Sequence, residues 1–275
     1  MPELPEVENI RRELDGSLRN KEILDCKVLR ASVIKNTDAS YFEQVMQNNV
    51  IEGFARRGKY LLGSLSTGHM LIVHLGMTGQ LYLSNEGTAM KKHTHVIWKL
   101  SGGEEMRFTD VRRFGGIHLL DNHDISCLPG LRKMGPEPLD PSFGPNDFLA
   151  LFEKKRSGAI KRWLLDQSFI AGIGNIYADE SLFAAGIYPG RDISTLTKKE
   201  KRKLYDSILS VLRQAIAEGG SSINDYINAR GQKGGFQESH KVYGKENVPC
   251  VICGTPLSSC KIAGRTTTYC RHCQK

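Results

Sequence analysis

The sequence predicts an α+β protein with an N-terminal β-sandwich behind one anchoring helix, a helical middle part and a small C-terminal metal-binding module. Three observations predict this class. Short apolar runs between glycine-rich turns fill residues 23–120, helical spacing follows after residue 145, and two Cys-x-x-Cys pairs end the chain. The predicted domains are residues 1–132, 133–238 and 239–275.

A first helix is predicted over residues 5–18. Pro5 suits a first turn, and the apolar side chains that follow recur at helical spacing. They are Val7, Ile10, Leu14 and Leu18. Burial of this single apolar face would anchor the N-terminus of the chain against a core.

Short strands are predicted from about residue 23 to residue 120. The clearest runs are residues 71–75, 95–100 and 116–120, and a glycine-rich turn at residues 101–103 follows the second run. Short apolar runs between such turns are typical of antiparallel sheets. The pattern therefore predicts a β-sandwich or a barrel.

The chain becomes helical after a stretch with proline and glycine at residues 128–145. Two apolar stripes have helical spacing, namely Phe148, Leu151 and Phe152, and then Ile160, Trp163 and Leu164. Thr197 and Glu200 form a capping box ahead of a further helix, which Gly219-Gly220 would end. The basic run at residues 198–203 is interpreted as the solvated face of that helix.

Charge and composition restrict the possible partners. The 275-residue chain carries a formal net charge of +8 and has a pI near 9.1, which favours an anionic partner, most simply nucleic acid. No apolar run reaches the roughly 18 residues of a membrane span, and the start lacks a secretory signal. We therefore expect a soluble, cytoplasmic protein with no membrane partner. We also expect a monomer.

The cysteines indicate a metal site. Cys250-x2-Cys253 and Cys270-x2-Cys273 have the spacing of a tetrahedral Zn²⁺ site with four thiolate ligands. The seven cysteines are odd in number, which fits reduced thiols and a metal better than a disulfide framework. A closed four-cysteine site is structural, and it would fold a basic module that is too small for a core of its own.

Pro2 and Glu3 are a candidate nucleophile and its acid/base partner. Removal of Met1 would leave a secondary amine, and an α-amino group ionises near pH ~8, so a neutral fraction could attack a carbonyl-like carbon and form a Schiff base. Taken alone, the two residues are better explained as a permissive second position and a surface charge, because most N-termini are disordered.

Two further patterns are candidate contacts with nucleic acid, the first with the phosphate backbone and the second with stacked bases. A glycine-rich turn leads into a helix expected near Asn175, where N–H groups and the amide side chain would hold a phosphate, although an ordinary tight turn explains it equally well. Basic and aromatic residues interleave at residues 56–60 and 107–115 and could wedge between bases. In isolation, core aromatics on a solvated strand explain this second pattern better, and Met77 is more often a core residue than a wedge.

Taken together, these residues resemble the bacterial formamidopyrimidine-DNA glycosylases, also called 8-oxoguanine DNA glycosylases. The resemblance spans the whole chain in the family's order. Its motifs are Pro2-Glu3-Leu4-Pro5-Glu6-Val7-Glu8, Lys59-Tyr60-Leu61-Leu62, His74-Leu75-Gly76-Met77, Asp110-Val-Arg-Arg-Phe-Gly115, Gly172-Ile-Gly-Asn-Ile-Tyr-Ala-Asp-Glu180 and the terminal four-cysteine finger.

The resemblance implies a catalytic β-sandwich, a helix–two-turns–helix domain and a zinc finger. It also implies a bifunctional enzyme that excises oxidised purines from double-stranded DNA and then cleaves the abasic strand by β,δ-elimination. In this family Pro2 would attack C1′ of the damaged nucleotide, and Glu3 would protonate the opening sugar. Lys59 would contact the lesion phosphate and assist β-elimination, and Arg265 would bind phosphate and is linked to δ-elimination.

The resemblance also implies residues that contact DNA. Met77, Arg112 and Phe114 would fill the gap that the flipped base leaves. Further implied contacts are His93, Lys155 and Asn175. The sequence departs from the family at Asn224, in the segment that closes over the everted base, where the family commonly has arginine, and at Thr266, where glycine is more frequent.

Two other functions fit parts of the sequence. A glycosylase of the endonuclease VIII type, which prefers oxidised pyrimidines, usually has glycine at the position of Leu4 and lacks the set of Met77, Arg112 and Phe114. A non-catalytic damage-binding zinc protein would have no use for an amine beside a carboxylate. Both alternatives therefore explain the sequence less well.

Overall fold

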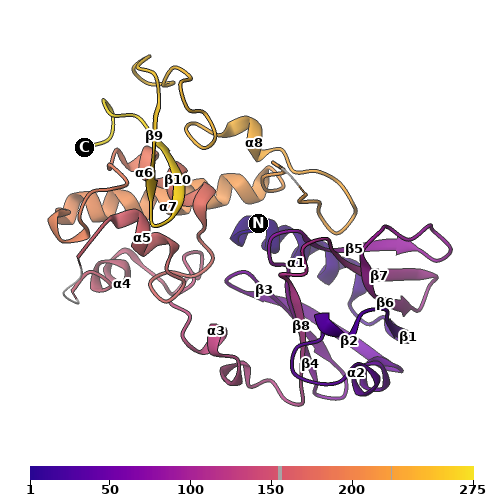
Figure 1. Ribbon diagram of the computed structural model, residues 1–275. Coiled ribbons are helices and arrows are strands. Elements are labelled where there is room, and N and C mark those ends of the chain that lie inside the picture. The colour runs from indigo at the N-terminus through magenta and orange to yellow at the C-terminus, as the bar shows by residue number, and fades with distance from the viewer. Residues whose placement is uncertain (154–156, 224) are drawn as a thin grey trace. The chain divides into compact units, whose positions relative to one another are not determined.

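The structure is a computed structural model that describes residues 1–153, 157–223 and 225–275 (Figure 1). Contacts divide the chain into two units. The first holds residues 1–132 and 218–237, and the second holds residues 133–217 and 238–275. None of the described helices is long and apolar enough to cross a lipid bilayer.

Residues 218–237 pack with the N-terminal unit, whereas the sequence-based division places them in the helical domain. The N–H of Leu83 donates to the carbonyl of Ala229 at 2.7 Å, and Tyr226 and Ala229 join the core of the sandwich. The division into three domains stays a prediction.

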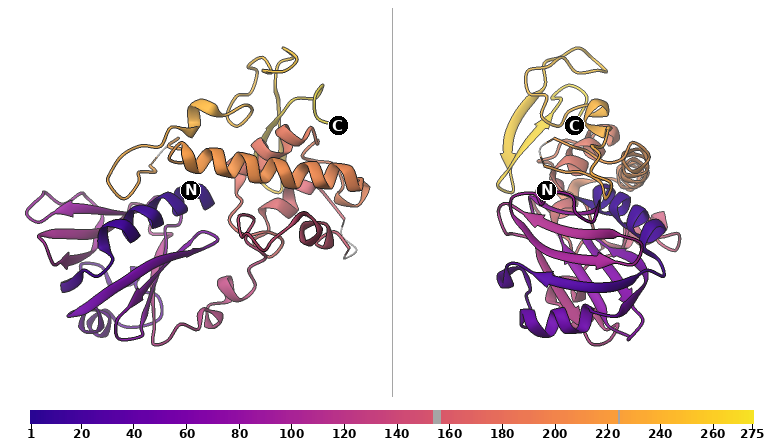
Figure 2. Two further views of the ribbon diagram at one scale, coloured as in Figure 1. Left: turned by 180° about the vertical axis from the view of Figure 1, so that it is seen from behind. Right: turned by 90° about the vertical axis from the view of Figure 1, so that its right-hand side faces the viewer.

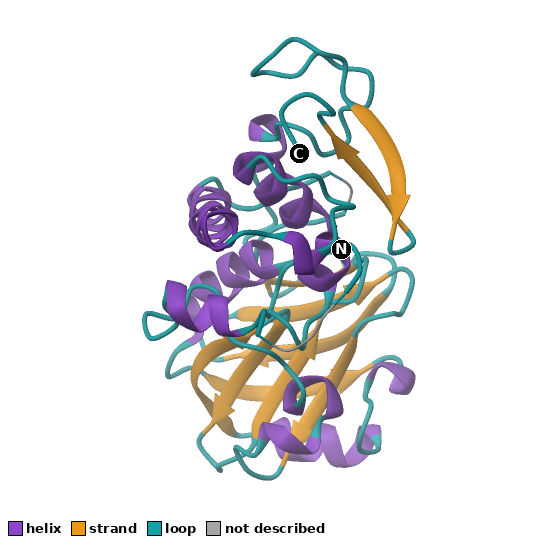
Figure 3. Ribbon diagram, turned by 90° about the vertical axis from the view of Figure 1, so that its left-hand side faces the viewer, coloured by secondary structure: helices purple, strands orange, loops and turns teal. Residues whose placement is uncertain are grey.

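The N-terminal unit contains the predicted antiparallel β-sandwich (Figure 3). Within the described residues, eight strands follow the order β5-β7-β6-β1-β2-β3-β4-β8, and β1 and β2 pair only where each begins. They are β1 (Glu22–Val28), β2 (Asn49–Arg57), β3 (Tyr60–Leu65), β4 (Met70–His74), β5 (Gly79–Asn85), β6 (Thr94–Leu100), β7 (Glu104–Asp110) and β8 (Gly116–Leu120). The three predicted runs lie on β4, β6 and β8, which confirms them.

Helix α1 (Leu4–Leu18) anchors the N-terminus as the apolar spacing predicts (Figure 2). Its four predicted apolar side chains are fully buried, and the helix packs against β2 and β3. The core that they enter also contains Phe42, Trp98 and Phe108. Shorter elements of this unit are η1 (Ala31–Val33), α2 (Ala39–Met46), η2 (Ile125–Cys127) and α3 (Pro129–Arg132).

The second unit is helical, as predicted. Its helices are α4 (Pro145–Ala150), α5 (Ile160–Leu165), α6 (Asn175–Ala185), η3 (Ile193–Thr195) and α7 (Lys198–Ala217), and α8 (Phe236–Ser239) begins at the boundary of the two units. Helix α4 ends before Leu151 and Phe152, so the first apolar stripe is only partly helical. Phe152 nevertheless packs on Phe148, with the ring centroids 5.2 Å apart.

The capping box of α7 forms as predicted. The N–H of Glu200 donates to Thr197 Oγ1 at 3.3 Å, and the N–H of Thr197 donates to Glu200 Oε2 at 2.8 Å. These two N–H groups have no partner within the helix, and the capping box supplies one for each. The helix ends before Gly219, whose φ of 80° takes the left-handed conformation of a helix end.

The C-terminal finger contains a hairpin of β9 (Ser258–Ile262) and β10 (Arg265–Tyr269). Its two-residue turn, Ala263-Gly264, has φ values of 50° and 72°. Positive φ at both turn positions matches the twist of an antiparallel hairpin, and glycine adopts it without strain. Strand β10 packs against α6 of the same unit.

Candidate active site and metal centre

The N-terminus is held in place. Pro2 is buried, Glu3 is 3% exposed, and both lie directly before α1. The N–H of Glu3 donates to Glu6 Oε2 at 2.8 Å. An amine at Pro2 would therefore begin from a fixed backbone, which a nucleophile requires for an oriented attack.

Glu6 also reaches the segment that follows α7. Its Oε1 accepts the N–H of Ser221 at 2.7 Å, and its backbone carbonyl accepts the Tyr226 hydroxyl at 3.4 Å. The sequence interpretation missed Glu6 as a positioning residue, although the Glu3-x-x-Glu6 spacing of a capping box was a signal for it. Asn224, the departure noted in this segment, lies outside the described residues.

Lys59 lies in the two-residue turn that joins β2 to β3, and it is 8% exposed. Its charge acts on the pKa of His74, on strand β4. Burial, reinforced by the positive charge of Lys59, lowers the pKa of His74 to about 4. His74 is thus a neutral imidazole at physiological pH, and its ring lies 4.7 Å from that of Tyr60.

The predicted wedge residues come together on two neighbouring loops of the sandwich. Met77, 36% exposed, lies between β4 and β5, while Arg112 and Phe114 lie between β7 and β8. Phe114 is 59% exposed, and the guanidinium carbon of Arg112 lies 4.8 Å from the centre of its ring. His93 is also exposed, and its carbonyl accepts the N–H of Asp110 at 3.2 Å, directly before this second loop.

In the second unit, the glycine-rich turn leads into α6, which begins at Asn175 as predicted. Gln167 fixes the turn, because its side chain accepts from the N–H of Gly172 and donates to the carbonyl of Ile173, both at 2.8 Å. Asn175 Nδ2 donates to the carbonyl of Thr266 at 3.0 Å. The turn is thus linked to the strand that begins with Arg265, so two predicted phosphate ligands are brought together. Lys155, another predicted contact, lies outside the described residues.

A buried ion pair attaches the hairpin to α6. Lys161 and Asp179 are at most 1% exposed and lie 2.6 Å apart. Lys161 Nζ also donates to Thr267 Oγ1 at 2.7 Å, and the N–H of Thr268 donates to Asp179 at 3.3 Å. Burial raises the pKa of Asp179 to about 6, although Lys161 acts in the opposite direction. The sequence interpretation missed this pair, whose only signal was a lysine inside an apolar stripe.

The next residue of α6, Glu180, holds the start of the finger. Its carboxylate accepts the N–H groups of Lys241, Val242 and Tyr243 at distances from 2.8 to 3.1 Å. Three consecutive backbone donors on one carboxylate make strong, charge-assisted hydrogen bonds. Helix α6 therefore holds β10 through Asp179 and the start of the finger through Glu180.

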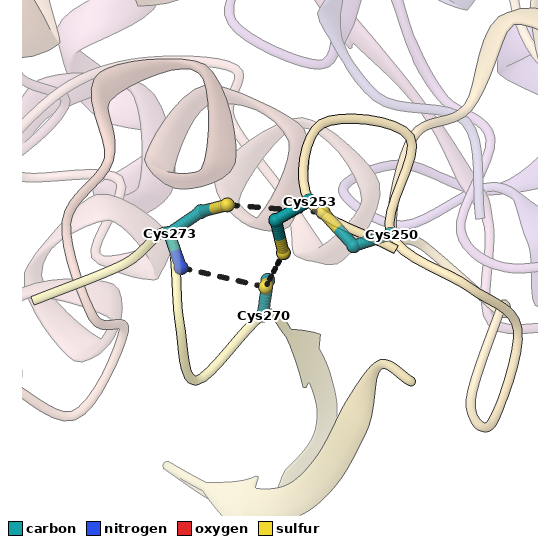
Figure 4. A group of neighbouring side chains, drawn as sticks. All are labelled: Cys250, Cys253, Cys270 and Cys273. Carbon is teal, nitrogen blue, oxygen red and sulfur yellow. Dashed lines mark hydrogen bonds between the residues drawn. The ribbon is translucent and has the colours of Figure 1, made fainter. Parts of the chain in front are cut away.

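The four predicted cysteine ligands converge (Figure 4). All four sulfur atoms of Cys250, Cys253, Cys270 and Cys273 lie within 4.8 Å of one another. The sulfurs of Cys253 and Cys270 are 3.5 Å apart, and those of Cys250 and Cys273 are 3.9 Å apart. Tetrahedral coordination with metal–sulfur bonds of about 2.3 Å requires sulfur separations of about 3.8 Å. The four thiols therefore form a metal site, and Cys260 lies outside it, on β9.

Substitution of Lys161 by methionine tests the buried ion pair. The change would leave the Asp179 carboxylate buried without its cation, and we expect a loss of about 3–5 kcal/mol in the free energy of unfolding. The double variant Lys161→Met/Asp179→Leu removes both charges and should recover most of this loss. Urea unfolding followed by circular dichroism measures both values. A single variant as stable as the parent would show that the buried Asp179 carboxyl does not need the Lys161 cation.

Comparisons with known proteins agree with this arrangement. The family model "Formamidopyrimidine-DNA glycosylase N-terminal domain" matches residues 1–117, and the model "Formamidopyrimidine-DNA glycosylase H2TH domain" matches residues 134–226. A curated relative, the formamidopyrimidine-DNA glycosylase of Desulforamulus reducens, is 42% identical, and the alignment covers 100% of this chain and 99% of the relative.

Solved structures show the same fold. A complex between a mutant of the Lactococcus lactis enzyme and DNA containing Fapy-dG has a TM-score of 0.92, with 35% identity over 100% of both chains. A complex of the same enzyme with DNA containing an abasic site has a TM-score of 0.91, with 35% identity over 99% of both chains.

The β-sandwich, the helix–two-turns–helix domain and the four-cysteine finger together define a class of DNA-repair glycosylases, enzymes that excise damaged bases. Within this class, the chain belongs to the formamidopyrimidine-DNA glycosylase family. The resemblance, the fold class and the type of enzyme expected from the sequence are thereby confirmed.

Proposed function

We propose that this protein excises oxidised purines from double-stranded DNA and cleaves the resulting abasic strand, with the amine of Pro2 as nucleophile. The observation that carries the proposal is the fixed N-terminus, where a buried Pro2-Glu3 pair is tied to α1 by the bond from the Glu3 N–H to Glu6. The complexes of the Lactococcus lactis enzyme with Fapy-dG and abasic DNA support the choice of substrates.

The reaction begins with the neutral amine of Pro2. Its nitrogen lone pair forms a bond to C1′ of the everted nucleotide, the bond from C1′ to the base breaks, and the base leaves with that electron pair and takes up a proton. The attached nitrogen then loses its proton, and its lone pair forms the second bond to C1′ as the bond from C1′ to the ring oxygen breaks. Glu3 protonates that oxygen, so the sugar opens and a cationic Schiff base joins Pro2 and C1′.

Strand cleavage follows from this Schiff base. Loss of a proton from C2′ sends its electrons toward the cationic nitrogen and expels the 3′ phosphate, and a second elimination expels the 5′ phosphate. We assign the phosphate contact at the first elimination to Lys59 and that at the second to Arg265. Met77, Arg112 and Phe114 fill the vacated base position, and His93, Lys155 and Asn175 bind the backbone.

We further propose that the metal of the four-cysteine site is a single structural Zn²⁺. Four thiolates in a closed tetrahedral set favour zinc, and such a site supplies folding free energy rather than a reacting group. The ligands must remain reduced, which supports a cytoplasmic location. The finger would then present Arg265, exposed at the start of β10, to phosphate.

Borohydride trapping tests the nucleophile. With Met1 removed, incubation with abasic DNA and borohydride should reduce the Schiff base to a stable cross-link, and mass spectrometry should locate the DNA on Pro2. A tag placed ahead of Pro2 converts its nitrogen into an amide without a nucleophilic lone pair, so trapping should be lost. The same tag at the C-terminus is the matched control and should leave trapping intact.

A cross-link that maps to Lys59, or equal trapping by the N-terminally tagged protein, would remove Pro2 from the mechanism. Lesion choice is tested separately by excision rates on duplexes that contain 8-oxoguanine or thymine glycol. Faster excision of the purine lesion supports the proposal, and a clear preference for thymine glycol would assign the enzyme to oxidised pyrimidines.

A further inference from the structure

Asp110, the last residue of β7, is a carboxylate with no solvent exposure at the base of the wedge loops. We propose that Asp110 is a positioning residue that fixes the loop of Met77 relative to the loop of Arg112 and Phe114, and thereby sets how efficiently a paired lesion is everted. This inference rests on the proposed function, because it takes these three side chains to enter the base stack.

The hydrogen bonds of Asp110 join both loops. Its Oδ1 accepts the hydroxyl of Thr78 at 2.5 Å and the N–H of Arg112 at 3.2 Å, while its Oδ2 accepts the N–H of Gly115 at 2.8 Å. The N–H of Arg112 is shared with Thr78 Oγ1 at 3.0 Å. One carboxylate therefore binds Thr78 directly after Met77, the backbone of Arg112 itself, and Gly115 directly after Phe114.

Backbone packing makes this connection tight. Gly76 has a φ of 60°, and a β-carbon at this position would lie 2.5 Å from the nitrogen of Gly115 and 2.6 Å from the carbonyl carbon of Phe114. The two loops therefore touch backbone to backbone at a site where no side chain fits. His74, neutral at physiological pH, accepts the N–H of Gly76 through Nδ1 at 3.2 Å.

The exposed side chains themselves lack comparable support. Met77 and Phe114 are 36% and 59% exposed, and Arg112 is exposed as well. Arg112 and Phe114 contact each other, but their position relative to Met77 depends on the buried contacts beneath the two loops. A carboxylate side chain suits this position, because its two oxygens accept hydrogen bonds from three donors, one hydroxyl and two N–H groups.

Correct placement matters most when the lesion is still stacked and paired. Eversion from a duplex requires unstacking, which the wedge side chains offset by occupying the gap, whereas an unpaired nucleotide in a single strand needs little of this help. A defect confined to the wedge should therefore slow excision from a duplex and spare Schiff-base formation on single-stranded abasic DNA.

The test uses Asp110→Asn, in which one accepting oxygen becomes a donor at unchanged size. Loss of a buried acceptor should reduce the single-turnover excision of 8-oxoguanine from a duplex by roughly 10- to 100-fold. Trapping on a single-stranded abasic oligonucleotide should change by less than about threefold, because no base has to be unstacked there.

Thr78 supplies a second pair of variants in case Asp110→Asn folds poorly. Thr78→Val removes the hydroxyl and should show the same selective defect, while Thr78→Ser keeps the hydroxyl and should restore duplex excision. Thr109→Val, a buried change at the neighbouring position of β7, is the matched control and should leave both readouts unchanged.

Equal losses on both substrates would reduce Asp110 to a purely structural role and overturn the inference. Unchanged duplex excision in Thr78→Val, with normal trapping by the parent protein, would also overturn it while leaving the proposed function intact. Failure of the parent protein to trap on abasic DNA would overturn the proposed function and this inference with it.

Discussion

Replacement of Glu3 by glutamine should lower the rate of base excision from a lesion duplex by about 10²–10⁴-fold, because a positioned general acid contributes about this much. The amide has the size of the acid but cannot donate a proton to the opening sugar. Trapping on DNA that already contains an abasic site should fall much less, because the amine of Pro2 is unchanged and no base has to leave. Single-turnover excision and borohydride trapping measure the two steps separately.

The matched control for this variant is Glu52→Gln, the same chemical change at an exposed position of β2 in the same unit. It should leave both steps unaffected. The N–H of Glu3 donates to Glu6, and this backbone contact at the helix start is unchanged by Glu3→Gln. An excision rate within a few-fold of the parent would assign proton transfer to another group.

Removal of the metal should have the largest effect on the second unit. Structural Zn²⁺ in small cysteine modules contributes about 10–16 kcal/mol of apparent binding free energy, which is also the free energy that folds the module. Cys270→Ser removes a ligand with no solvent exposure. We expect loss of bound metal, exposure of the finger to protease and a decrease of at least about 100-fold in affinity for abasic duplex DNA, as several phosphate contacts are lost.

Cys260→Ser is the control, because Cys260 lies on β9 outside the metal cluster. It should retain one metal ion per chain and full affinity. Metal content is measured by mass spectrometry of the native protein, and affinity by fluorescence anisotropy at physiological salt. Full affinity in Cys270→Ser, with the metal absent, would show that the finger does not need the metal to bind DNA.

Local patterns predicted the elements whose signals are contained in a few consecutive residues. The apolar spacing of α1, the capping box of α7 and the two cysteine pairs each depend on short-range geometry, and each forms as expected. Helix α4 is the exception, because it ends before Leu151 although the apolar spacing continues. Phe152 still reaches the core from outside the helix, so periodicity alone gave no helix boundary.

Much of the candidate site depends on contacts between distant residues, which no local pattern contains. Lys161 meets strand β10 more than a hundred positions along the chain, and Glu6 meets Ser221 across most of its length. Asp110 was visible only as part of a motif, whereas its bond to Thr78 follows from the pairing of β5 with β7. The proposed reacting groups rest on residue types and the family resemblance and stay a prediction, whereas the side chains that contact them required the fold.

The carboxylate of Glu6 binds two segments of the chain at once. One oxygen accepts the N–H of Glu3, beside Pro2, and the other accepts the N–H of Ser221. Thermodynamic linkage makes such a shared partner reciprocal. A ligand that changes the contact at Ser221 therefore changes the contact beside Pro2, and a change beside Pro2 acts on the contact at Ser221 to the same degree. Under the proposed function, DNA binding at this segment and reaction at Pro2 would therefore be coupled through Glu6.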